Sequence, residues 1–157
     1  NKRCASIKHA NIASFKARKQ KSLCRVMLCF ANSSPFDSLP VARRAVHRFA
    51  YPTADVTHIT QAASRLAEQL FQQDVRFYKI GVGLIDLVYG LHEQPELFNL
   101  TPNNPKLMNV YDTLNNRFGN DAIFLAAQGI TQKWAMRREM LSPQYTTRWQ
   151  DLPKIKC

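Results

Sequence analysis

Three segments of the chain are rich in apolar, β-branched and aromatic residues, and each predicts a β-strand. Residues 22–30 are almost wholly apolar, residues 43–51 alternate imperfectly between polar and apolar, and residues 75–88 alternate over their central part. A turn signal at residues 33–35 follows the first segment, and Pro52 ends the second. If a hairpin connects the first two strands, they are antiparallel.

Helical periodicity marks other parts of the chain. Residues 4–19 predict a basic helix with a weak apolar stripe. The clearest helix follows a possible N-cap at Asp55 or Thr57, because apolar residues recur there at the i, i+3, i+4, i+7 spacing. These apolar residues are Ile59, Ala62, Ala63, Leu66 and Leu70. Residues 107–118 predict a further helix that stops at Gly119.

The order of the predicted elements indicates an α+β fold. Helix, strand, strand, helix, strand is most of a split βαβ, ferredoxin-like unit, with two helices on one face of the sheet and the other face open. Residues 90–105 hold three prolines and three asparagines and predict a linker. Beyond it, residues 122–127 predict a short strand and residues 131–141 a helix, which indicates a small α/β module. The expected division is into residues 1–90, 91–105 and 106–157.

The formal net charge of +11 is concentrated at the two ends of the chain. Residues 1–50 carry eleven Lys and Arg against the single acid Asp37, residues 51–104 carry a net charge of −3, and residues 105–157 carry +4. Such a concentration attracts polyanions through counterion release, so nucleic acid is the first partner class and an anionic membrane the second. A merely well-solvated surface is the alternative. Because no apolar run approaches the roughly 18 residues of a membrane span, we expect a soluble protein.

Four cations carry the nucleic-acid hypothesis, because the period-2 geometry of strands could place them on one face of the sheet. They are Arg25, Arg44, Arg48 and Lys79. The opposite face would then carry Val26, Leu28, Ile80 and Val82. A sheet face with several cations follows phosphates and does not read bases. Ordinary solvated charge is again the alternative.

Catalytic and metal-binding motifs are absent from the sequence. It has no Gly-rich phosphate loop and no adjacent acids, its four cysteines lack CxxC spacing, and its four histidines are scattered. Two-metal phosphoryl chemistry needs a cluster of carboxylates, whereas Asp86, the acid inside a predicted strand, has no near neighbour in sequence. We therefore expect no catalytic residue, metal or other cofactor in this chain.

Several longer strings resemble one known family. CRVMLCF, SPF, YPTADVTHITQAA and FYKIGVGLIDL, which begin at Cys24, Ser34, Tyr51 and Phe77, are similar to the little-finger domain of UmuC-type, Y-family translesion DNA polymerases. The string WAMRREMLSPQYTTR, which begins at Trp134, resembles the C-terminal extension of the same proteins. The resemblance implies a little-finger domain without its first strand, followed by that extension. The catalytic palm and its Mg²⁺ would belong to the parent polymerase.

The resemblance also implies partners in the bacterial cytoplasm: template–primer duplex DNA, a β sliding clamp, a UmuD′-like subunit and a RecA filament. In this family a QLxLF-like peptide docks on the clamp. The linker carries QPELF, which matches at Gln94, Leu97 and Phe98 and has Pro95 where the family usually has Leu. In the basic and aromatic tail we expect Arg148 and Trp149 to be the exposed pair that meets a protein partner.

Two other functions use the same basic sheet face. An RNA-binding domain of similar topology would need aromatic stacking residues on its central strands. The first strand is expected to present Cys24, Arg25, Met27 and Cys29 on the open face, which provides no stacking platform. A protein-interaction module would use the basic patch to bind an acidic partner.

Overall fold

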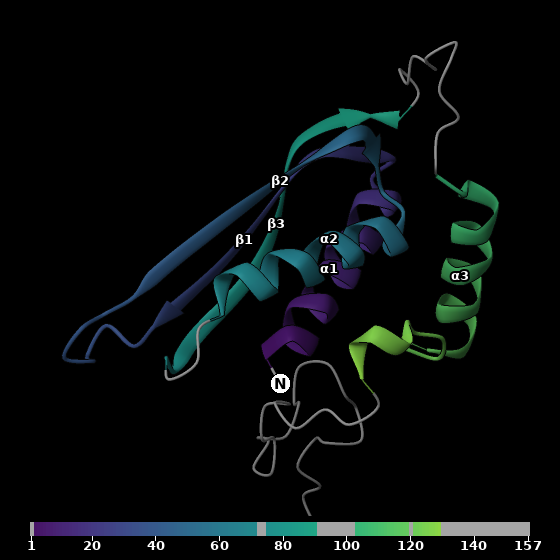
Figure 1. Ribbon diagram of the computed structural model, residues 1–157. Coiled ribbons are helices and arrows are strands. Elements are labelled where there is room, and N and C mark those ends of the chain that lie inside the picture. The colour runs from purple at the N-terminus through teal and green to yellow at the C-terminus, as the bar shows by residue number, and fades with distance from the viewer. Residues whose placement is uncertain (1, 72–74, 91–102, 120, 130–157) are drawn as a thin grey trace, which may run out of the picture.

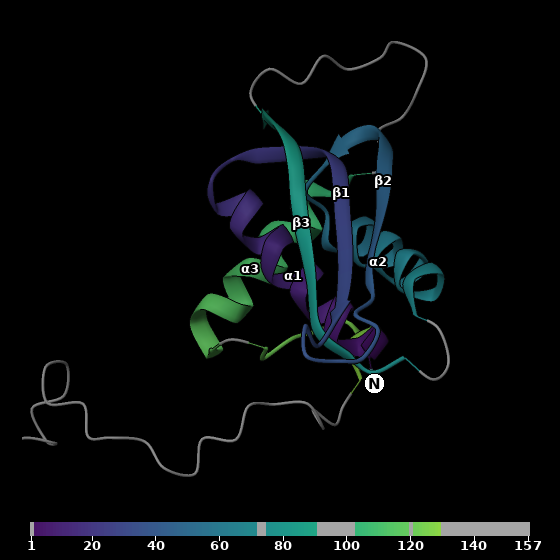
Figure 2. The same ribbon diagram turned by 90° about the vertical axis from the view of Figure 1, so that its left-hand side faces the viewer.

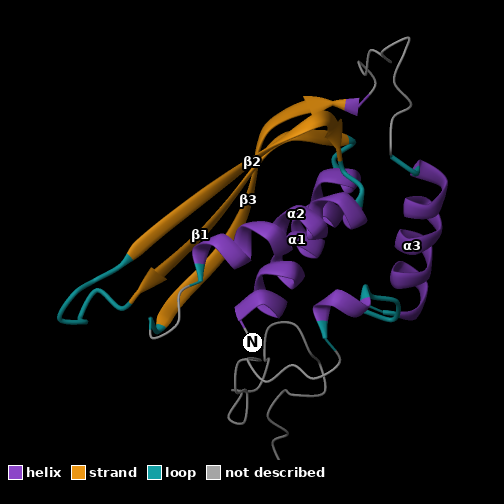
Figure 3. Cartoon of the chain, in the orientation of Figure 1, coloured by secondary structure: helices purple, strands orange, loops and turns teal. Residues whose placement is uncertain are grey.

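The computed structural model describes residues 2–71, 75–90, 103–119 and 121–129. Figure 1 labels its elements and Figure 3 colours them by type. In chain order the elements are α1 (Lys2–Lys19), β1 (Ser22–Ser33), β2 (Ala42–Thr53), α2 (Val56–Leu70), β3 (Phe77–Tyr89), α3 (Pro105–Phe118) and the short 3₁₀ helix η2 (Ala126–Gln128). No helix in this part of the chain is long and apolar enough to cross a membrane.

The three strands form one antiparallel sheet in the order β2-β1-β3, so β1 is central. Helices α1 and α2 pack on one face of this sheet, and Figure 2 shows the strands in front of them, with the other face turned to the viewer. The α+β class, the order helix, strand, strand, helix, strand and the split βαβ, little-finger-like arrangement are thereby confirmed.

Helix α2 forms where its apolar periodicity and its cap predict it. Asp55 is the N-cap, since its carboxylate accepts a 2.8 Å hydrogen bond from the backbone N–H of Thr57. The five apolar residues expected on one face of α2 are all buried, and they pack with Ala10 of α1 and with Met27 and Cys29 of β1. The core therefore lies between α2, α1 and the central strand.

Helix α1 buries a strip of mostly small residues, which explains why its apolar stripe is weak. Ile7, Ala10, Ser14 and Ala17 recur at helical spacing and are all buried. The buried Ser14 hydroxyl donates a 2.9 Å hydrogen bond to the carbonyl oxygen of Ala54. Small side chains let α1 approach its neighbours closely, and the hydroxyl has the partner that burial requires.

Helix α3 ends where it was predicted to end and begins two residues earlier than predicted, at Pro105. The side chain of Asn104 caps its start by accepting a 3.1 Å hydrogen bond from the backbone N–H of Leu107, and Pro105 occupies the first turn. The helix ends at Gly119, whose φ of 102° is accessible mainly to glycine.

The short strand predicted over residues 122–127 is wrong. The chain there makes a turn and bends and then enters η2. The amide of Asn115 takes the place of a strand partner: its oxygen accepts from the backbone N–H of Ile123 and its nitrogen donates to the Ile123 carbonyl, both at 3.0 Å. Ile123 and Phe124 are therefore exposed at about two fifths of their surface. The helix predicted over residues 131–141 lies outside the described residues.

Side-chain bonds attach α3 to the sheet domain. The Arg18 guanidinium of α1 makes two 2.6 Å hydrogen bonds to the Asp112 carboxylate of α3, and its third nitrogen donates to the Ala54 carbonyl at 2.8 Å. This nitrogen also donates to the Ser14 hydroxyl. The two charged side chains are only 11% and 20% exposed, so this ion pair is a specific and largely desolvated junction between three segments of the chain.

Candidate nucleic-acid interface on the open face of the sheet

The pairing register decides which side chains share the open face. Four residues of β1 define it, since each lies opposite one residue of β2 and one of β3. Each of these four residues forms a row across the sheet with its two partners. Written in the order β2, β1, β3, the rows are Arg48, Val26, Ile85; Val46, Leu28, Gly83; Arg44, Phe30, Gly81; and Ala42, Asn32, Lys79. The alternate residues of β1, Met27, Cys29 and Ala31, are buried under the helices. The open face therefore has an apolar centre with cations on its outer strands.

Three of the four expected cations meet on this face. Arg44 and Arg48 project from β2 and Lys79 from β3, and all three are exposed. Arg44 and Arg48 are four residues apart, which is about 13 Å along a strand. None of the residues that the register places on this face is acidic. These positions give an electropositive surface with two cations on one edge strand and one on the other.

Arg25 is exposed but does not join this group by register. It lies between Cys24 and Val26, where the β1–β2 register shifts because β2 has the extra residues 49–52 between Arg48 and Thr53. The β1–β3 register does not shift there and places Arg25 opposite Asp86. Arg25 is not an extra residue, and by alternation along β1 it shares the side of Met27 and Cys29, opposite to Arg44, Arg48 and Lys79. Whether Arg25 acts with the other three cations is therefore a question for experiment, and all four DNA-binding assignments stay predictions.

The apolar residues expected opposite the cations are placed correctly on β3 but wrongly on β1. Ile80 and Val82 lie on the helix side, opposite to the cations, as expected, but Val26 and Leu28 share the face of the cations. The physical reason is that β1 is the central strand and is apolar at almost every position, so alternation cannot specify which residues face the helices.

The expectation that the open face lacks an aromatic platform is also wrong. Met27 and Cys29 point to the helices, and Phe30 is on the open face. Its ring lies over Gly81, because a Cβ at Gly81 would come within 2.4 Å of Cζ of Phe30. Glycines at 81 and 83 alternate with apolar residues on β3, and this alternation is the one sequence signal that could have indicated which face stays open.

Burial changes the chemistry of the thiols on and near the covered face. It raises the pKa of Cys29 to about 11, and it raises the pKa of Cys24 as well. Both thiols are free. They are therefore neutral at physiological pH and add no negative charge behind the basic face.

The other predicted site residues lie outside the described residues. They are Gln94, Leu97 and Phe98 of the expected clamp peptide and Arg148 and Trp149 of the tail. Within the described part of the chain, no group of three or more His, Cys, Asp or Glu side chains could hold a metal ion. The expectations of clamp docking, of a partner for the tail and of no cofactor stay predictions.

Comparison with known proteins defines the class. Residues 5–97 match the impB/mucB/samB family C-terminal domain, and residues 105–155 match a Domain of unknown function (DUF4113). The first match covers more than half of the chain, so the chain belongs to the impB/mucB/samB family. No solved structure gives a significant match.

The individual relatives agree with this family. Protein MucB of Escherichia coli is 38% identical over 146 residues, which are 90% of this chain and 34% of that protein. Protein UmuC of Salmonella typhimurium is 36% identical over 161 residues, which are 98% of this chain and 38% of that protein. The chain thus spans little more than a third of these relatives, and its resemblance to the C-terminal part of UmuC-type proteins is confirmed.

Proposed function

We propose that the chain is the DNA-gripping, clamp-docking C-terminal part of a UmuC-type polymerase for translesion synthesis in the bacterial SOS response. The observation that carries the proposal is the open sheet face, where the register collects Arg44, Arg48 and Lys79 with no acid among them. Membership in the impB/mucB/samB family supports the polymerase context. The catalytic carboxylates and Mg²⁺ would lie in another part of the parent polymerase.

The geometry of the face suits the backbone of a duplex. The separation of about 13 Å between the Cα atoms of Arg44 and Arg48 is similar to the width of the major groove, about 12 Å, so the two guanidinium groups can meet phosphates on either side of it. Contacts of Arg and Lys with phosphates carry no sequence information. A grip of this kind lets a polymerase hold any template and slide along it.

Salt dependence tests the proposal directly. We expect weak binding to duplex DNA, with a slope of log K against log salt of about −2.7 for three neutralised phosphates. Arg44→Ala, Arg48→Ala and Lys79→Ala should each reduce the steepness by about 0.9. Arg117→Ala, which removes an exposed cation from α3, is the matched control and should leave the slope unchanged. A slope near zero, or one that the triple variant does not alter, would refute the assignment to this face.

Arg25 is tested in the same titration. If it contributes a fourth contact, the slope of the unmodified protein is about −3.6, and Arg25→Ala brings it to about −2.7. An unchanged slope in Arg25→Ala means that this side chain does not contact the duplex.

Phe30 favours a second candidate, a platform for single-stranded nucleic acid such as RNA. A half-buried ring at the centre of a basic sheet face is where a base can stack, and a stacked base is worth about 1–3 kcal/mol. Phe30→Leu keeps the apolar volume but removes the stacking surface. If it weakens binding to single strands by tenfold or more and leaves duplex binding intact, the second candidate is favoured over the first.

The second half of the proposal is docking of Gln94, Leu97 and Phe98 on a β sliding clamp. Described residues at both ends of the linker are held to the domain: the backbone N–H of Gly90 donates to Lys21 at 2.9 Å, and the Asn103 amide donates to the Pro52 carbonyl at 3.0 Å. A short peptide buries little area, so we expect an affinity in the micromolar range or weaker.

A pair of double variants tests clamp docking. Replacing Leu97 and Phe98 by Ala should abolish the calorimetric signal of clamp binding without changing DNA affinity or thermal stability. Replacing Leu91 and Leu100 by Ala, in the same linker but outside the motif, should leave clamp binding unchanged. A lower melting temperature with intact clamp binding in the first variant would mean that Leu97 and Phe98 are core residues.

The remaining parts of the proposal concern the absence of catalysis and the tail. The chain alone should incorporate no nucleotide in primer extension with Mg²⁺ and dNTPs, and extension by the pure chain would contradict this. Arg148 and Trp149 are proposed to contact a UmuD′-like subunit, with a RecA filament as a further partner. Protection of residues 142–157 from proteolysis by the UmuD′-like partner supports this, whereas protection by DNA alone contradicts it.

A further inference from the structure

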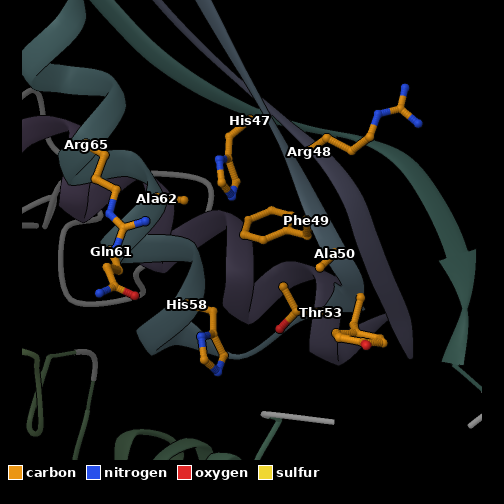
Figure 4. A pocket seen from close by; sticks show the side chains of 10 residues that line it. His47, Arg48, Phe49, Ala50, Thr53, His58, Gln61, Ala62 and Arg65 are labelled. Atoms are coloured by element: carbon orange, nitrogen blue, oxygen red, sulfur yellow. The ribbon is translucent and has the colours of Figure 1, made fainter. Parts of the chain in front are cut away.

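A groove runs between β2 and α2, away from the open face. It has a volume of about 300 Å³, and Figure 4 shows the side chains that line it. Five consecutive residues of β2, His47 to Tyr51, contribute to its lining. Successive strand residues point to opposite faces of a sheet. This alternation is interrupted at residues 49–52, where the pairing of β2 with β1 shifts between Arg48 and Thr53, so the groove follows the irregular end of the outermost strand and is not confined to one face.

The outer edge of β2 has no neighbouring strand in the described part of the chain. β2 is outermost in the order β2-β1-β3 and pairs with β1 alone. The outer side of an edge strand presents N–H donors and C=O acceptors in alternation, which is a template for one more strand. β2 pairs regularly with β1 over residues 42–48, so this stretch is where an added strand finds its partners.

The groove beside this edge is basic and has an apolar floor. His58, Gln61 and Arg65 stand at the i, i+3, i+7 spacing on α2 and form one wall. Phe49 and Ala62 lie between this wall and the strand, and Figure 4 shows Arg48 pointing away from them.

None of the described residues that line the groove is acidic. β2 carries three Arg and one His but no acid. Glu68, the acid of α2 closest in sequence to Arg65, makes a 3.1 Å ion pair with Arg3 of α1.

We propose that an extended acidic polypeptide binds this groove as an added strand on the edge of β2. Its backbone pairs with the outer edge of the strand, and one set of its alternate side chains faces the groove. Acidic members of that set meet Arg65, and small apolar members cover Phe49. This binding mode, in which backbone bonds give affinity and alternate side chains give specificity, is the general one for strand addition.

A polypeptide fits this edge better than a nucleic acid of the same charge. The edge offers both donors and acceptors. A phosphodiester backbone offers acceptors alone, so it would leave the strand carbonyls without partners, whereas a peptide satisfies both. The volume of the groove is also at the lower limit for small-molecule pockets, which typically measure about 300–1,000 Å³. It is large enough for a few side chains.

A designed peptide tests the inference on the full chain. The probe is a fluorescein-labelled peptide of about eight residues in which Glu alternates with Val, and anisotropy measures its binding. We expect a dissociation constant of about 10–100 µM at low salt, because the interface is small. Arg65→Glu should weaken binding about tenfold, since it reverses an exposed charge in the wall. Arg117→Glu makes the same change on α3 and should have no effect.

Backbone pairing is tested through the peptide, which does not disturb the protein. N-methylation of alternate peptide residues removes the donors along one edge of the added strand. One of the two alternating patterns should abolish binding and the other should retain it. Equal binding of both methylated peptides would reduce the interaction to charge attraction and overturn strand addition. Absence of binding by the unmodified peptide, or tighter Arg65-dependent binding of a single-stranded oligonucleotide, would overturn it as well.

Discussion

The two faces of the sheet differ in what covers them, although the same three strands form both. On the helix side Met27 and Cys29 are almost completely buried against α1 and α2. On the open side Val46 is 59% and Ile85 44% exposed, and cations stand beside them. An apolar centre that stays in contact with water and is bordered by charge is typical of an interaction surface. The covered face therefore provides stability, and the open face is available for binding.

The largest expected effect is the loss of Met27 from the covered face. Met27→Ala should lower the free energy of unfolding by about 3 kcal/mol, because it leaves a cavity in the core. Val46→Ala, on the open face, should lower it by less than about 0.5 kcal/mol. Urea denaturation of both variants measures the difference. Equal losses would mean that the open face is covered by another part of the chain.

A second pair of variants compares a buried with an exposed ion pair of α1. Asp112→Ala leaves the Arg18 guanidinium largely desolvated and without its carboxylate, so we expect a loss of about 2–3 kcal/mol in unfolding free energy. Glu68→Ala removes the partner of Arg3, and since both side chains of that pair are more than half exposed, the loss should stay below about 0.5 kcal/mol. Thermal unfolding distinguishes the two, and similar losses would contradict a buried junction.

The two glycines of β3 test the open face itself. Gly81→Ala places a Cβ 2.4 Å from Cζ of Phe30, so the ring must move, at an expected cost of about 1 kcal/mol. Gly83→Ala meets nothing within 4 Å and should be neutral or slightly stabilising. Thermal unfolding gives the stabilities, and the NMR shifts of the Phe30 ring report its movement. A ring that does not move in Gly81→Ala would contradict its position over this glycine.

The smallest effect is a pH dependence that the covered face should show through Cys29. Burial raises the pKa of Cys29 from 9.0 to about 11, so the folded state favours the neutral thiol. Its contribution to stability is complete below about pH 9 and is lost as the pH rises through about 11. Denaturation between pH 8 and 11 should therefore show a decline in stability that is weaker in Cys29→Ala. An identical decline in the variant would assign it to other groups, such as the Tyr111 hydroxyl, whose pKa burial also raises.

Most of the helices and strands were predictable from the sequence, but the tertiary contacts that they make were not. Helix α2 is the clearest case, because its Asp55 cap and apolar spacing are local signals that the packing then uses. Residues 122–127 are the opposite case: an apolar run has strand propensity, but a strand needs a neighbour, and here the Asn115 side chain pairs with Ile123 instead. No local sequence pattern predicts a contact between the Asn115 side chain and the backbone of Ile123.

The sequence by itself determined the presence of the helices and the three strands, because caps, turns and periodicity act within a few residues. It also determined the basic character of the N-terminal part, which is a matter of composition. Only the tertiary structure decided which side of β1 is covered. A central strand that is apolar on both sides fits either orientation, so the small residues of α1 and the apolar stripe of α2 select Met27 for the core and leave Phe30 outside. The Arg18–Asp112 pair has the same origin, since its partners are 94 residues apart and meet only when α1 and α3 are both in place.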